Sequence, residues 1–163
     1  MNCLQNLIEL NNSKFTSLLR NEANIDALIN QELSIQLLKR FAKRLILLSS
    51  SSYISFTLKR ILELDSQDIS VLVALAWELW SVGEDEECRS NAYKAKNISP
   101  GNKWVLYLLV ALADSTSDKI LILEKLSLHE PENSQIKLNL HNLQSGKPNI
   151  VLEFSTDDCM FDW

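Results

Sequence analysis

Apolar residues recur every three or four positions through the middle of the chain, which is the spacing of one face of an α-helix. The clearest stripe consists of Leu72, Leu75, Ala76 and Leu79. Gly83 follows as a helix-ending residue, and the acidic run at residues 84–87 suits the first turn of another helix. This stretch therefore predicts two helices joined by a tight turn.

The pattern returns at an interval of about 34 residues, which is the length of a helix–turn–helix repeat. Leu64-Asp65-Ser66 lies one such interval before Ile98-Ser99-Pro100. One interval back, the apolar stripe is formed by Leu38, Phe41, Ala42 and Leu45. One interval forward it is formed by Leu106, Leu109, Val110 and Ala113, in a copy about three residues short. An all-α fold with three helical pairs over residues 35–133 is therefore predicted.

The segments on either side predict helices that cap this array. Apolar groups within residues 1–33 indicate two or three short helices, and Ile136, Leu140 and Leu143 indicate one more over residues 134–145. Caps are expected because the end of a repeat array otherwise exposes its apolar face. Residues 149–163 are polar and acidic, so we expect one domain over residues 1–148 and a flexible tail after it.

The repeat resembles the tetratricopeptide repeat family. Apolar residues occupy the family's large positions, Gly83 stands at the turn, Cys88 and Ala95 supply small residues in the second helix, and Pro100 ends the unit. The large aromatic residue usual in the second helix is replaced by Ala92. The resemblance implies a short right-handed superhelix of about three helical hairpins, whose first helices line a concave groove.

Residues about 120° around the first helices from the apolar stripe are expected to face that groove. They include two lysines and four aromatic residues: Lys39, Lys43, Trp77, Trp80, Trp104 and Tyr107. Aromatic anchors beside charge are typical of protein-binding sites. The sequence thus predicts capture of an extended or helical peptide with apolar and acidic groups. The alternative is that the aromatic residues pack on the capping helices as ordinary core.

The last residues, Phe161-Asp162-Trp163, raise a separate question because an aromatic residue stands where the chain is expected to be mobile. A tail of this kind can carry one hydrophobic residue without purpose. It can also fold back into the basic, aromatic groove as a plug. Finally, the tripeptide resembles the C-terminal signal by which clients and adaptors dock on the cytosolic iron–sulfur targeting complex, although Phe161 replaces the usual aliphatic residue.

Composition and charge narrow the functional classes. A net charge of −5 and a pI near 5.1 argue against nucleic-acid binding, which needs a basic face. The longest apolar run, Val105 to Ala113, is too short for a membrane span of roughly 20 residues. We therefore expect a soluble cytoplasmic protein, with the nucleus as the other compartment open to it.

No catalytic or cofactor site is predicted. Cys3, Cys88 and Cys159 are too scattered for a disulfide framework, a zinc site or an iron–sulfur cluster, and the two histidines lack metal-ligand spacing. Carboxylates beside Cys88, at Glu86 and Glu87, raise the pKa of a thiol and so disfavour a nucleophile.

The sequence therefore predicts a non-catalytic binding module, serving as an assembly factor, an adaptor or a dedicated chaperone, whose partner is another protein or a peptide segment. One alternative is a structural subunit of a stable complex. Another is a bacterial secretion chaperone, because those small acidic proteins also resemble the chain in size and in having three such repeats. Their more regular glycine-containing turns are missing here.

Overall fold

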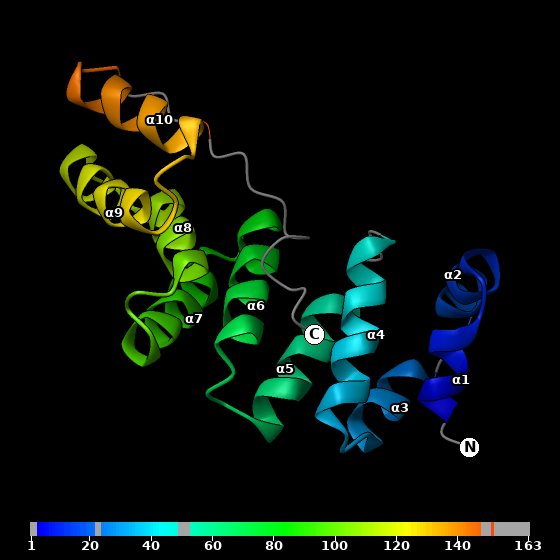
Figure 1. The fold of residues 1–163 in the computed structure, drawn as a ribbon. Coiled ribbons are helices and arrows are strands. Elements are labelled where there is room, and N and C mark those ends of the chain that lie inside the picture. Colours follow the sequence, from blue (N-terminus) through cyan, green and yellow to red (C-terminus); the bar gives the residue numbers. More distant parts are fainter. Residues whose placement is uncertain (1–2, 22–23, 49–52, 148–150, 152–163) are drawn as a thin grey trace.

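The computed structural model describes residues 3–21, 24–48, 53–147 and 151. Over these residues the chain forms ten α-helices and no strand, which confirms the all-α prediction (Figure 1). The helices are α1 (Cys3–Glu9), α2 (Asn12–Asn21), α3 (Ile25–Gln31), α4 (Ile35–Leu47), α5 (Ile54–Leu64), α6 (Ile69–Ser81), α7 (Asp85–Ile98), α8 (Lys103–Leu112), α9 (Thr116–His129) and α10 (Ser134–Gln144).

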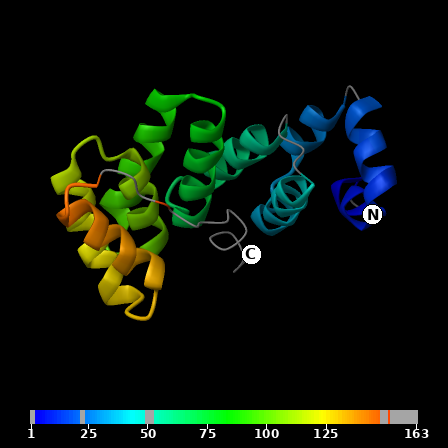
Figure 2. The ribbon, with the colours of Figure 1, turned by 90° about the horizontal axis from the view of Figure 1, so that it is seen from above.

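The helices are stacked in the order in which they occur in the sequence. Helix α4 packs on α5, α6 on α7, and α8 on α9, so three successive pairs form. The pairs are joined by contacts of α5 with α6, α7 with α8, and α9 with α10, and α6 also contacts α8. The stack is elongated, with α1 and α10 at opposite ends (Figures 1 and 2).

The repeat is visible in the spacing of the residues that cap the first helix of each pair. The N-caps Ser34, Asp68 and Asn102 are evenly spaced in the sequence, and Asn133, which caps α10, comes three residues earlier than an equal step would place it. Each side chain accepts hydrogen bonds from backbone N–H groups of the first turn, which would otherwise lack a partner. The regular interval and the shortened third copy are thus as the sequence predicts.

The same short turn leads into α6, α8 and α10. The C-cap residues that end the preceding helices are Asp65, Ser99 and Glu130, each three residues before an N-cap. In each turn the N-cap N–H donates to the carbonyl oxygen of that end residue, at N···O distances of 3.4, 3.1 and 3.0 Å. A turn of constant length and hydrogen bonding brings each new helix into its pair in the same way.

The core is built from the predicted stripes. The side chains of Leu72, Leu75, Ala76 and Leu79 are buried, and those of Cys88, Ala92 and Ala95 are fully enclosed, so α6 and α7 approach closely. Gly83 between them has φ of 82°, a left-handed conformation that other residues adopt at a cost. This glycine allows α6 to end and α7 to begin within a short turn.

Arg44 on α4 binds the backbone of the N-terminal helices. Its half-buried guanidinium donates to the carbonyl oxygens of Leu7, Ile8 and Leu10. It also lies 4.1 Å from the centroid of the Phe15 ring. Carbonyl groups at a helix C-terminus attract cations, so Arg44 fastens α1 and α2 to α4.

We predict that Arg44→Lys loosens the N-terminal helices. A lysine has one terminal nitrogen in place of the two that Arg44 directs at these carbonyl oxygens, so the substitution should cost roughly 1.5–3 kcal/mol. Hydrogen exchange should become faster across α1 and α2 while α6 to α9 stay protected. Arg20→Lys, at an exposed position of α2, is the control and should leave exchange unchanged. Equal exchange in both variants would show that Arg44 does not hold the cap.

Candidate protein-binding surface

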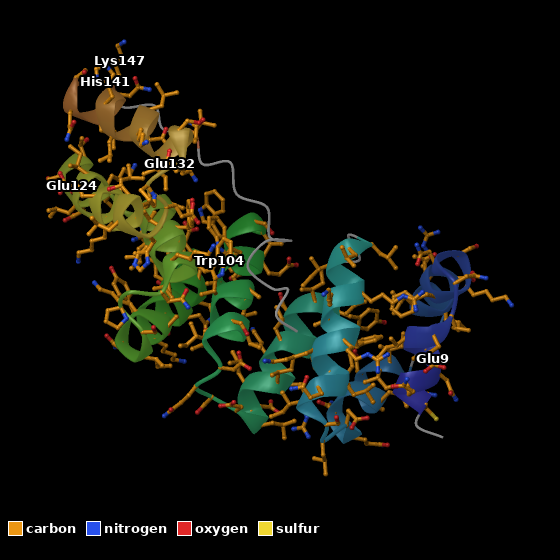
Figure 3. The ribbon with its side chains drawn as sticks, in the orientation of Figure 1. Glu9, Trp104, Glu124, Glu132, His141 and Lys147 are labelled. Atoms are coloured by element: carbon orange, nitrogen blue, oxygen red, sulfur yellow. The ribbon has the colours of Figure 1, made fainter. Side chains whose placement is uncertain are left out.

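The six predicted site residues lie on matching faces of α4, α6 and α8. Counted from each N-cap, Trp104 is at the second position, Lys39 and Tyr107 at the fifth, Lys43 and Trp77 at the ninth, and Trp80 at the twelfth. These positions are three or four residues apart, so they form one stripe per helix. We call this shared face the aromatic–basic face; Trp104 lies on the side of α8 that is turned toward α6 (Figure 3).

The aromatic residues form two pairs. The rings of Trp77 and Trp80 meet edge to face, with centroids 5.3 Å apart and an interplanar angle of 78°. The rings of Trp104 and Tyr107 are tilted by 31° with centroids 6.0 Å apart. Lys103 Nζ lies 4.3 Å from the centroid of the Trp104 ring, within the range of a cation–π contact.

Exposure divides the aromatic residues into supports and contact residues. Trp77 and Tyr107 are 7% and 6% exposed, whereas Trp80 is 47% exposed and Trp104 is partly buried. The sequence predicts the same groove-facing role for all four aromatic residues. In the structure one buried ring supports one accessible ring in each pair, which leaves Trp80 and Trp104 as the side chains that can meet a ligand.

Lys39 joins two successive first helices. Its Nζ lies 2.5 Å from Asp68 Oδ2, and the two side chains are only 13% and 11% exposed. Burial by itself raises the pKa of the Asp68 carboxyl, but hydrogen bonds from Lys39, Ser70 and the Val71 N–H, together with the Lys39 charge, lower it overall. Lys39 therefore neutralises the N-cap of α6. The sequence misses Asp68 as its partner, although an aspartate just before a predicted helix was a usable signal.

Tyr107 makes the corresponding contact between α8 and α10. Its hydroxyl donates to Glu130 Oε2 at 2.7 Å, and Asn133 Nδ2 donates to both the Tyr107 hydroxyl at 3.2 Å and Glu130 Oε2 at 2.8 Å. Burial, and then the bond to Glu130 and its charge, raise the pKa of Tyr107, which stays neutral. At both junctions a side chain five residues after one N-cap contacts the N-cap of the next first helix.

A hollow lies apart from the aromatic–basic face, over α7, α8 and α9. Its apolar lining includes Tyr93 and Leu121, which are 51% and 57% exposed, and its rim carries the Arg89 Nη2–Asp114 Oδ1 pair at 3.0 Å. Arg89 also donates to the Leu112 carbonyl oxygen at 3.0 Å. This hollow is not apparent from the sequence, because its residues come from three helices and show no common spacing.

The structure also shows the surroundings of the residues that could bind a metal ion or act as a nucleophile. In the part of the chain that the structure describes, no three His, Cys, Asp or Glu residues are grouped to hold a metal ion. Cys88 is fully buried, and its pKa is raised by burial first and by the charge of Asp85 second. The acidic neighbour that matters is thus Asp85, not the predicted Glu86 and Glu87.

Some predictions fall on residues that the structure does not describe. Phe161, Asp162 and Trp163 lie outside the described residues, as do Cys159 and nearly all of the predicted tail. The choice between a targeting signal and a plug therefore stays a prediction, and so does docking on the cytosolic iron–sulfur targeting complex.

We predict that Asp68→Asn removes a pH-dependent part of the stability while keeping an N-cap acceptor. The pKa of Asp68 is lower in the folded chain than in the unfolded one. The ionised pair with Lys39 therefore stabilises the fold above about pH 4, and this stabilisation is lost as the pH falls through the pKa of Asp68 in the folded chain. Urea unfolding should show a gap between the native chain and the variant at pH 7 that narrows toward pH 3.

Asp26→Asn, at an exposed position in the first turn of α3, is the matched control. Its gap at pH 7 should be smaller than that of Asp68→Asn, because the exposed Asp26 side chain is surrounded by water. If the gap for Asp68→Asn stays constant from pH 7 to pH 3, the pairing of Asp68 with Lys39 contributes nothing to stability.

No helix among the described residues is both long enough and apolar enough to cross a membrane.

Similarity to known proteins adds no information about the chain. No protein-family model matches the sequence, and neither the curated proteins nor the solved structures contain a match. A function has to be inferred from the contacts and exposures of the aromatic–basic face.

Proposed function

We propose that the chain is a non-catalytic protein-binding module that captures a peptide or protein segment on the aromatic–basic face. The observation that carries this proposal is the pair of accessible indoles, Trp80 and Trp104, each seated on a buried aromatic ring. A supported ring has few conformations to lose when a ligand covers it. Assembly factor, adaptor and dedicated chaperone are the roles that fit such a module.

The repeating junctions support a tetratricopeptide-type arrangement for this face. The even spacing of the N-caps, the constant turn and the contact of α6 with α8 are what a right-handed superhelix of helical hairpins requires. In such an arrangement the first helices line the concave side. The aromatic–basic face would then be the groove of the module.

The charges on the face indicate the chemistry of the ligand. Lys39 pairs with Asp68, and Lys103, whose Nζ lies over the Trp104 ring, pairs with Glu130, so these two charges are balanced within the face. Lys43 on α4 is a further basic residue on this face of a chain whose net charge is −5. Covering the exposed half of Trp80, on the order of 120 Å², contributes roughly 3 kcal/mol at about 25 cal/mol per Å². The preferred ligand is thus a segment with aromatic or aliphatic anchors flanked by a few carboxylates.

We predict that the double substitution Trp80→Ala and Trp104→Ala removes peptide capture without unfolding the chain. Twelve-residue peptides selected from a displayed random library on the full-length protein should be rich in apolar and acidic residues. Their binding, measured by fluorescence anisotropy, should weaken at least about tenfold in the variant, because two anchors of roughly 1 kcal/mol or more are lost.

The control is Tyr93→Ala, which removes an equally exposed ring from α7, away from the aromatic–basic face. It should leave the peptide affinity unchanged, and circular dichroism should show equal helix content in all three proteins. A library that yields no binders, or binders that tolerate loss of both indoles, would refute the proposed function.

A structural subunit of a stable complex is a second candidate, favoured by the apolar surface around α9. Leu121 and Leu128 lie about two helical turns apart and are 57% and 83% exposed, and Leu121 borders the hollow with Tyr93. A contiguous apolar patch on a surface indicates an interaction site, which a companion chain would cover.

We predict different behaviour of the isolated chain in the two cases. A free module should be monomeric by light scattering, and Leu121→Lys with Leu128→Lys should change nothing. A subunit lacking its companion should self-associate, and the same double substitution should restore a monomer, whereas Trp80→Lys should not.

A further inference from the structure

A buried amide on α10 binds the backbone of the segment that follows it. Asn139, 1% exposed, donates from Nδ2 to the Val151 carbonyl oxygen at 2.7 Å and accepts from the Val151 N–H at Oδ1, at 3.1 Å. Gln135 Nε2 donates to the same Oδ1 at 3.2 Å, which fixes the orientation of the amide. Asn139 therefore holds both polar groups of one residue, as a neighbouring β-strand would.

This clamp lies on the face of α10 that continues the aromatic–basic face. Gln135 is the second residue after the N-cap of α10, as Trp104 is in α8 and Ser70 in α6. Asn139 follows one turn later, and the N-cap Asn133 contacts Tyr107. At about 1.5 Å per residue the clamp is about 9 Å along α10 from that contact. Val151 is thus held at the edge of the face.

The chain beyond Val151 has the composition that the face selects. Residues 152–163 contain four carboxylates, at Glu153, Asp157, Asp158 and Asp162, no lysine or arginine, and the aromatic residues Phe154, Phe161 and Trp163. Twelve residues reach up to about 40 Å when extended, and neighbouring helices pack roughly 10 Å apart. From the clamp, this segment is long enough to reach α8 and α6, which carry the aromatic residues of the face.

We propose that residues 152–163 are an intramolecular ligand of the aromatic–basic face, delivered to it by the Asn139 clamp. This inference rests on the proposed function, because it takes the same face as the binding site. Tethering gives the segment an effective concentration of about millimolar order, so weak contacts suffice to occupy the face. An external partner must displace it, and a partner that resembles it in charge and aromatic content competes directly.

The test places a photo-crosslinker in the full-length chain. Phe161 is replaced by benzoylphenylalanine, the protein is irradiated, and crosslinked peptides are mapped by mass spectrometry. The proposal expects crosslinks to the segments that carry Trp77 and Trp80 or Trp104 and Tyr107. In a mixture of isotope-labelled and unlabelled protein, those crosslinks should join residues of the same chain.

The clamp is tested by adding Asn139→Leu, which keeps the branched shape of the side chain but removes both bonds to Val151. The crosslinks to the face should fall several-fold, whereas Asn142→Leu, less than one turn further along α10, should leave them unchanged. Library-selected peptides should bind Asn139→Leu about two- to fivefold more tightly than the native chain, because the internal competitor is weakened.

Crosslinks that map to the hollow of α7 and α9, that join two copies of the chain, or that ignore Asn139→Leu would overturn this inference. The proposed function stands in that case if selected peptides still need Trp80 and Trp104. Conversely, peptides that ignore the two indoles refute the proposed function, even where crosslinks show the segment on the face as a structural element.

Discussion

The structure depends on one contact that occurs at two junctions, between the first helix of a pair and the N-cap of the next first helix. Lys39 reaches Asp68, and Tyr107 reaches Asn133 through a cluster that includes Glu130. Each N-cap side chain also accepts hydrogen bonds from the first turn of its own helix. One side chain therefore both caps its helix and fixes the distance of that helix from the preceding first helix. Local helix formation and long-range stacking are therefore coupled at the same atoms.

This coupling also explains how the aromatic–basic face arises. The contact side chains occupy the fifth position after the N-cap, on the stripe that carries Trp77, Trp80 and Trp104. Aligning the N-caps therefore aligns the stripes, and the ring pair of α6 and the ring pair of α8 occupy matching faces of their helices. At the middle junction Val73 stands at the fifth position and is buried, so packing takes the place of a polar contact there. The face is a by-product of the register that holds the pairs together.

Charge serves structure more than the sequence suggests. Arg44 and Lys39 come from one basic stretch, yet the first binds carbonyl oxygens of the N-terminal helices and the second binds the N-cap of α6. The Lys103 ammonium lies over the Trp104 ring and also pairs with Glu130, so it too has a structural contact. A partner is thus recognised chiefly through apolar anchors, with charge setting the approach.

Several features were determined by the sequence alone: the all-α class, the regular interval of the helical pairs, the turn at Gly83 and the shortened third copy. Helix periodicity, caps and left-handed glycines are properties of neighbouring residues, and a single chain displays them directly. Only the tertiary structure decided that Trp77 and Tyr107 are buried supports, that Arg44 is a clamp and that Asn139 holds Val151. Those roles depend on which residues distant in sequence meet across helices, and this is fixed by packing and not by spacing.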